Sequence, residues 1–244
     1  MSEATAHTKR KSRVLGLALT SALATVALAG CSGKAAPTAA HSAEAARAAL
    51  AKGKGDKAVA AAEAAVLAAP RDAAARALLG AAYIEAGRFL SAATAFEEAM
   101  TLGDTAPRTV LTRSLALSAA GRYAEAQTLL ADHQPAIDAT DYGLAITLAG
   151  SPSQGIEALS NALKYGENSA KLRQNLAYAF ALKGDWRSAR HLAAQDVSAD
   201  KLAARLGEWA ELSAPQMAAH RVAALLGVTV KPDEGQPAHL ALAR

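Results

Sequence analysis

Residues Leu78 to Leu102 read LLGAAYIEAGRFLSAATAFEEAMTL and form part of the clearest copy of a repeated pattern in the chain. Its glycine belongs to a series, since Gly53, Gly87 and Gly121 lie 34 residues apart, Gly150 follows after 29 residues and Gly184 after another 34. Ala58, Ala92 and Ala126 keep the same interval of 34. A fixed interval of this length indicates a chain built from stacked structural repeats.

The residues around these glycines resemble the tetratricopeptide repeat, a hairpin of two helices in 34 residues. The copy from Ala73 to Ala106 has the family's pattern at Leu79, Gly80, Tyr83, Gly87, Phe89, Ala92, Phe96 and Ala99. The copy from Ala170 to Ala203 has it at Leu176, Ala177, Phe180, Gly184, Trp186 and Ala189. The resemblance implies an all-α solenoid of about five helix hairpins with C-terminal capping helices.

Small residues recur in this pattern because two helices approach closely only where small side chains meet. Gly80 is expected at such a crossing, with larger side chains such as Phe96 filling the space beside it. Gly87 is expected in the turn, where a positive φ ends one helix before the next begins.

Three other units are weaker copies. The first runs from Ala39 to Asp72, the fourth from Ala136 to Ser169, and the third, Pro107 to Pro135, is five residues short. The short unit is expected to tilt the stacking locally, and Pro152 is expected at the first position of a helix. The stretches 199–212 and 214–226 are expected to be the capping helices, the first with Ser198 as its N-cap. We therefore predict a solenoid with caps over residues 42–227 and a flexible tail over 228–244.

The first thirty residues have the parts of an export signal. Lys9, Arg10, Lys11 and Arg13 precede an apolar stretch that ends at Gly30. From Val14 this stretch has 17 residues, fewer than the roughly 20 of a membrane-spanning helix. We predict a signal peptide over residues 1–30 and a tether over 31–41, since residues 32–41 are rich in Ala, Gly, Ser and Pro.

The residues Leu28-Ala29-Gly30-Cys31 resemble the lipobox of bacterial lipoproteins. The resemblance implies cleavage before Cys31 and lipid, including palmitate, on its thiol. The alternatives are a free thiol acting as a small hydrophobic residue and an uncleaved anchor. Ser32 after the cysteine resembles the outer-membrane sorting pattern, which implies an anchor on the periplasmic face of that membrane.

The charge of the chain does not favour nucleic-acid binding. The chain has 26 Lys and Arg residues and 22 Asp and Glu residues. The first thirty residues hold four of the basic and one of the acidic residues, so the rest of the chain has 22 basic and 21 acidic residues. Its basic character therefore lies mainly in the signal peptide and not in a patch of the fold.

No motif for catalysis or a cofactor is present. The six histidines form no H-E-x-x-H and have no cysteine pair beside them, and G-x-S-x-G does not occur. The stretch Lys52 to Lys57, KGKGDK, lacks the full phosphate-loop pattern and falls in a repeat turn. Glu97, Glu98 and Asp185 are expected to be exposed helix charges and not a catalytic pair. We expect no enzyme, metal, cofactor or small-molecule substrate.

The family resemblance places a binding groove on the first helix of each hairpin. Carried over by position, the groove residues are Ile84 and Glu85, then Arg108, Leu111, Leu115 and Ser118, then Leu144, Thr147 and Leu148, and finally Lys171, Gln174, Tyr178 and Leu182. An apolar strip with polar edges suits an amphipathic helix or an extended segment. Leu111 and Leu144 fit packing between repeats equally well, whereas Arg108 and Tyr178 favour an interface, where Arg and aromatic residues are enriched.

Residues 170–215, with LRQNLAYAFALKGDWRSARHLAAQDVSADKLAARLGEWAELSAP from Leu172, resemble the TadD-type lipoproteins of the tight-adherence (Flp) pilus system. The resemblance implies a non-enzymatic, pilotin-like adaptor whose partners are the secretin or other pilus assembly components. The alternative is a general envelope scaffold for outer-membrane protein insertion or cell-wall enzymes.

Overall fold

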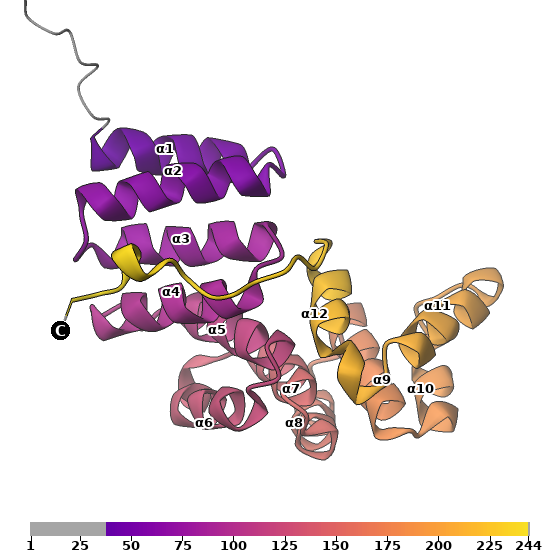
Figure 1. Cartoon of the computed structure of the whole chain (residues 1–244). Coiled ribbons are helices and arrows are strands. Elements are labelled where there is room, and N and C mark those ends of the chain that lie inside the picture. Colours follow the sequence, from indigo (N-terminus) through magenta and orange to yellow (C-terminus); the bar gives the residue numbers. More distant parts are fainter. Residues whose placement is uncertain (1–37, 244) are drawn as a thin grey trace, which may run out of the picture. The chain divides into compact units, whose positions relative to one another are not determined.

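The structure is a computed structural model that describes residues 38–243, so the predicted signal peptide and Cys31 lie outside the described residues. Those residues form twelve α-helices and no strand. Ten of the helices make five consecutive hairpins (Figure 1): α1 (Ala39–Leu50) with α2 (Gly55–Ala68), α3 (Ala73–Glu85) with α4 (Phe89–Thr101), α5 (Pro107–Ala119) with α6 (Tyr123–His133), α7 (Ala139–Leu148) with α8 (Pro152–Lys164), and α9 (Ala170–Lys183) with α10 (Trp186–Ala193). The predicted solenoid of five hairpins is confirmed, and α1 begins three residues before the predicted start at residue 42.

Glycine lets the two helices of a hairpin touch, as the pattern predicts. A Cβ atom added to Gly80 of α3 would lie 2.8 Å from the ring of Phe96 on α4. A Cβ atom on Gly143 of α7 would lie 2.4 Å from Cγ of Leu159 on α8. Since real Cβ atoms do not approach other atoms so closely, any larger residue at these positions pushes the helices apart.

The turn glycines adopt the expected left-handed conformation. Gly87 has a φ of +71°, and the N–H of Arg88 donates to the carbonyl oxygen of Tyr83 across the end of α3. This is the Schellman pattern, which satisfies the last carbonyls of a helix and reverses the chain. Pro152 begins α8, as predicted. Ser198 precedes α11, but its side chain makes no capping hydrogen bond.

The core is made mainly of small and aliphatic side chains. One cluster of buried residues extends from α1 to α7 and includes Val222 and Ala223 near the C-terminus. A second cluster joins α9, α10 and α11 around Trp209, and a third joins α8 and α9 around Leu159 and Leu172. Every hairpin is therefore held by apolar contact with its neighbours, as expected of a repeat protein.

The short third unit interrupts the regular stacking. After α6 the chain forms a 3₁₀ turn, Gln134–Ala136, and α7 begins at Ala139. α6 packs against α7 less extensively than α4 packs against α5. A hollow of about 590 Å³, lined by Ile137, Tyr142 and Tyr165 among others, lies at this break. The stacking is uneven here, as the missing five residues predict.

The two helices after the last hairpin have different positions. α11 (Ala199–Glu211) packs against α9 and α10, as a cap would. α12 (Ala218–Leu226) instead packs against α5 of the third hairpin. The prediction that both helices shield the last hairpin therefore holds for α11, whereas α12 turns back and covers part of α5.

The structure differs from the expected flexible tail over residues 228–244. In Figure 1 the segment after α12, in yellow, runs past α3 and α4. The N–H of Lys231 donates to the carbonyl oxygen of Gly87, and Asp233 accepts from the backbone N–H of Ser91 at 2.8 Å. Further along, Leu240 is 2 % exposed. The segment lacks a helical period because it is extended, and it is held mainly by bonds to distant parts of the chain.

A buried ion pair lies below the end of this tail. Arg76 of α3 is 1 % exposed and pairs with Glu98 of α4. Arg76 also donates to the carbonyl oxygens of Pro70 and Leu240, and Glu98 accepts from the N–H of Leu242 at 2.7 Å. Glu98 was expected to be an exposed charge, and that prediction is wrong, because the tail covers it.

Candidate protein-binding groove

Two hollows on the first helices of the last three hairpins meet at Leu144. The first, about 530 Å³, lies over α5 and α7, and the second, about 350 Å³, is lined from α7, α9, α11 and α12. Leu144 lines both of them. We call these two adjoining hollows together the inner groove.

The first hollow combines an apolar floor with charged edges. Leu111 and Leu115 of α5 are half-buried and lie with Leu144 in its lining. Arg108 at the start of α5 is exposed, and Asp141 of α7 lines the same hollow. This is the arrangement that an amphipathic helix or an extended segment requires.

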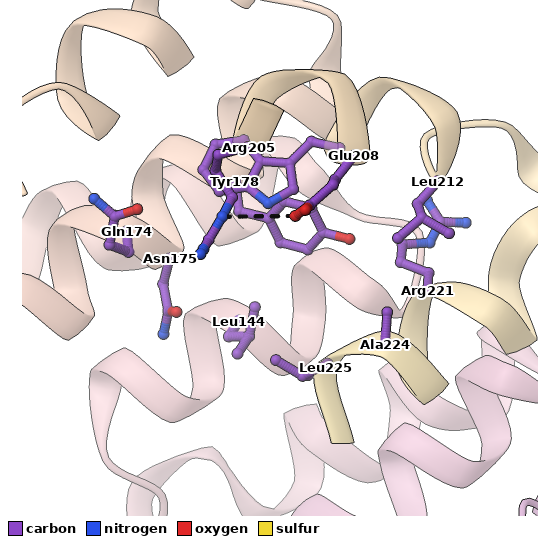
Figure 2. Close-up of a pocket in the computed structure, with 11 residues that line it drawn as sticks. Leu144, Gln174, Asn175, Tyr178, Arg205, Glu208, Leu212, Arg221, Ala224 and Leu225 are labelled. Carbon is purple, nitrogen blue, oxygen red and sulfur yellow. Dashed lines mark ion pairs between the residues drawn. The ribbon is translucent and has the colours of Figure 1, made fainter. Parts of the chain in front are cut away.

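The second hollow contains an aromatic pair, of which Figure 2 labels Tyr178. The rings of Tyr178 from α9 and Trp209 from α11 have centroids 5.2 Å apart and an interplanar angle of 51°. Tilted aromatic pairs at this distance are favourable and hold each other in place. Burial raises the pKa of Tyr178 to about 12, and the nearby guanidinium of Arg221 opposes this shift. The phenol is therefore neutral at physiological pH and available as a hydrogen-bond donor.

The charged residues of the second hollow are unevenly paired. Arg205 and Glu208, both exposed on α11, lie 3.7 Å apart as an ion pair, the dashed line in Figure 2. Arg221 of α12 is only 8 % exposed, and its Nη1 lies 3.5 Å from the carbonyl oxygen of Ser213. Among residues 38–243, no carboxylate lies within ion-pair distance of Arg221.

The structure brings together six of the thirteen predicted groove positions. Arg108, Leu111, Leu115 and Leu144 line the first hollow, and Leu144, Gln174 and Tyr178 line the second. Lys171 lines neither, but it is exposed and forms an ion pair with Asp141 of the first hollow.

The structure corrects the positions of Ile84 and Thr147. Ile84 is 8 % exposed and belongs to the main core, whose edge includes Val228 and Val230 of the C-terminal segment. Thr147 is buried and donates to the carbonyl oxygen of Gly143. A Cβ atom on Gly155 would lie 1.8 Å from the Thr147 hydroxyl, so Thr147 faces α8 inside its hairpin.

Sequence reasoning missed the residues that α11 and α12 add to the groove, above all Trp209 and Arg221. The stretches that contain these two residues were expected to be capping helices, so neither residue was placed in the groove. The 34-residue period ends before these helices, so it contains no signal for the return of α12 to α5. No group of three or more metal-ligating side chains occurs among the described residues.

Comparison with known proteins identifies the fold class. No family model and no curated protein matches the chain. One similar solved structure is that of YrrB, which is described as a tetratricopeptide-repeat protein with an unusual peptide-binding site. The TM-score is 0.53 and the sequence identity is 15 %, and the match covers 70 % of this chain and 92 % of YrrB. MamA from Desulfovibrio magneticus RS-1 matches with a TM-score of 0.52 and a sequence identity of 18 %, and the match covers 71 % of this chain and 95 % of MamA.

A third similar structure is that of Pseudomonas aeruginosa PilF, with a TM-score of 0.51 and 18 % identity over 77 % of this chain and 90 % of that one. Together with the five hairpins, these matches define the chain as a tetratricopeptide-repeat α-solenoid. Identities this low establish the fold, and the function has to be argued from the groove.

Proposed function

We propose that this protein is a non-enzymatic adaptor that binds a segment of another protein in the inner groove. The observation that carries the proposal is the groove itself: half-buried leucines on α5 and α7 continue into an aromatic pair on α9 and α11, with charged residues at the edges. Aromatic and arginine side chains around an apolar strip are the residues that anchor protein interfaces. YrrB, one of the similar structures, is described as having a peptide-binding site.

We infer that lipid on Cys31 holds the adaptor at a membrane. The inference rests on the lipobox residues Leu28 to Cys31 at the end of the signal-like stretch. Within residues 38–243, none of the helices has the length and apolar character needed to cross a bilayer. Two or more acyl chains on one cysteine anchor a protein stably. We propose the periplasmic face of the outer membrane as the location, because Ser32 follows the cysteine.

We propose a component of the Tad/Flp pilus machine, such as its secretin, as the partner. The support is the resemblance of residues 170–215 to TadD-type lipoproteins, and this region forms α9, α10 and α11. Tyr178 and Trp209, the aromatic pair of the groove, lie in it. The part of the chain with this resemblance is thus also a wall of the proposed binding site.

Affinity capture of the full chain from detergent-solubilised envelopes tests the proposal. We expect the wild type and the control variant Leu67→Asp to retain secretin or pilus assembly components, because Leu67 is exposed on α2, outside the groove. Leu111→Asp places a charge on the floor of the groove and is expected to lose them. Capture that is equal for all three chains would contradict the groove. Leu111-dependent capture of insertion factors or cell-wall enzymes would instead favour a general envelope scaffold.

A further inference from the structure

The described chain contains two buried arginines, and only one of them is fully paired. Arg76 has Glu98 and the carbonyl oxygens of Pro70 and Leu240 as partners. Arg221 is 8 % exposed, and within residues 38–243 its only hydrogen-bond partner is the carbonyl oxygen of Ser213. At 3.5 Å this contact is at the outer limit for a hydrogen bond.

Within residues 38–243 no nitrogen of Arg221 is both fully buried and unpaired, so the guanidinium keeps contact with the water of the hollow. Burial of the residue as a whole reduces that hydration, and such a loss is costly unless an opposite charge or several hydrogen bonds replace the water. Arg221 lines the second hollow, which therefore holds a positive charge without its counter-charge. Glu208, which lines the same hollow, lies beside Arg205. The hollow thus has the charge complementary to an anionic group from outside the chain.

A second unpaired group lines the same hollow. Oε1 of Gln174 is buried and has no hydrogen-bond donor among the described residues. The amide nitrogen of Gln174 makes only long contacts, 3.4 Å to the carbonyl oxygen of Ala193 and 3.4 Å to Asp196. A buried acceptor without a donor costs free energy, so this amide oxygen gains a partner if the side chain turns toward an N–H of a bound segment.

Apolar surface lies between these two polar groups. Tyr178 and Trp209 form an aromatic wall, and Leu144 connects the hollow to the floor over α5. Figure 2 shows Leu144 and Leu225 on the side of the hollow opposite Glu208. A segment that lies across Leu144 would therefore place one polar side chain near Arg221 and its apolar neighbours on the aromatic wall.

We propose that the second hollow recognises an Asp or Glu side chain of the partner segment, with Arg221 as the residue that pairs with its carboxylate. The inference rests on the proposed adaptor function and adds the chemical feature that the partner must have: an acidic residue flanked by apolar residues. A side chain is favoured over a chain terminus because the first hollow adjoins the second at Leu144, and a segment that occupies both hollows extends beyond the neighbourhood of Arg221. Arginine binds carboxylates through two parallel hydrogen bonds, which gives both strength and orientation.

The test uses the full chain in mild detergent with Trp186→Phe, which leaves Trp209 as the only tryptophan and a fluorescent reporter of the hollow. The probes are two pools of acetylated and amidated 15-residue peptides, identical except that the central residue, flanked by leucines, is Glu in one pool and Gln in the other. We expect the Glu pool to bind about tenfold or more tightly, as the loss of a charge-assisted hydrogen bond implies.

Arginine variants assign the preference to one residue. Arg221→Gln is expected to remove the preference for the Glu pool, and Arg221→Lys, which keeps the charge without the two-pronged geometry, to reduce it. The matched control Arg190→Gln changes an exposed arginine of α10 that lines neither hollow, and it is expected to keep the preference. Circular dichroism verifies that each variant retains its helices.

Equal affinity for the two pools, binding of neither pool, or a preference that persists in Arg221→Gln would overturn the inference. A third peptide pool has Gln at its centre and a free C-terminal carboxylate. It shows whether Arg221 recognises the carboxylate of a side chain or that of a chain terminus. Tighter binding of that pool through Arg221 would overturn the side-chain assignment. Failure of the adaptor function is recognised separately, by capture that does not depend on Leu111.

Discussion

At Gly80 the lack of a side chain lets α3 and α4 touch, and this contact makes a sharp prediction. Gly80→Leu forces atoms into the ring of Phe96, which already lies 2.8 Å from the position of an added Cβ. Overpacking of this kind costs about 1–3 kcal/mol, and the melting temperature is expected to fall accordingly. Thermal unfolding followed by circular dichroism measures it.

Gly207 provides the control for Gly80, because it is also a helical glycine but has no atom within 4 Å of an added Cβ. Gly207→Ala is expected to stabilise the protein by roughly 0.5–1 kcal/mol, since alanine loses less backbone entropy in a helix. If Gly80→Leu and Gly207→Ala shift the melting temperature equally, the helix crossing is not at Gly80.

The pair of Arg76 and Glu98 makes a second prediction about single residues. Glu98→Ala leaves the guanidinium of Arg76 buried without a counter-charge, and such a loss typically costs about 3–5 kcal/mol. The neighbouring change Glu97→Ala removes an exposed partner of Arg113, and exposed pairs contribute about 0–1 kcal/mol. Urea unfolding of both variants gives the comparison. Similar losses of unfolding free energy in the two variants would show that Glu98 is as solvated as Glu97.

The elements of the molecule differ in how far the sequence predicts them. The hairpins follow from short-range patterns, since small residues at crossings and glycines in turns act within about 34 residues. The positions of Leu111, Leu144 and Tyr178 within their repeats predict that these residues line the groove. The return of α12 to α5 and the course of the tail depend on contacts between residues far apart in sequence, for which one sequence contains no periodic signal.

The tail makes a prediction of its own at this scale. Asp233 accepts from the N–H and hydroxyl of Ser91 and lies 3.6 Å from Arg88. Hydrogen bonds to a charged group contribute about 1.5–3 kcal/mol, so Asp233→Ala is expected to lower stability by a comparable amount and to speed amide hydrogen exchange at Ser91.

The matched control for Asp233 is the adjacent Glu234, which is exposed. Glu234→Ala is expected to leave both the stability and the exchange rate at Ser91 nearly unchanged. Slow exchange at Ser91 in the Asp233→Ala variant would contradict the packed tail and return residues 228–244 to the flexible state that their sequence predicts.

For the whole molecule, the proposed lipid anchor determines where the groove is presented. Cys31→Ser removes the only thiol of the chain and is expected to leave a precursor without lipid that no longer fractionates with the outer membrane. Metabolic labelling with a clickable palmitate analogue, followed by membrane fractionation, measures both effects. Normal labelling and fractionation of the variant would contradict the lipidation of Cys31.

The adaptor account is tested most directly by placing a photo-crosslinking residue in the groove of the protein in living cells. We predict that p-benzoylphenylalanine at Leu144, where the two hollows meet, gives a discrete adduct with one envelope protein, and that the same residue at Leu67, exposed on α2, gives none. An adduct from Leu67 with no adduct from Leu144 would contradict the account, because the partner would then bind a different face of the solenoid.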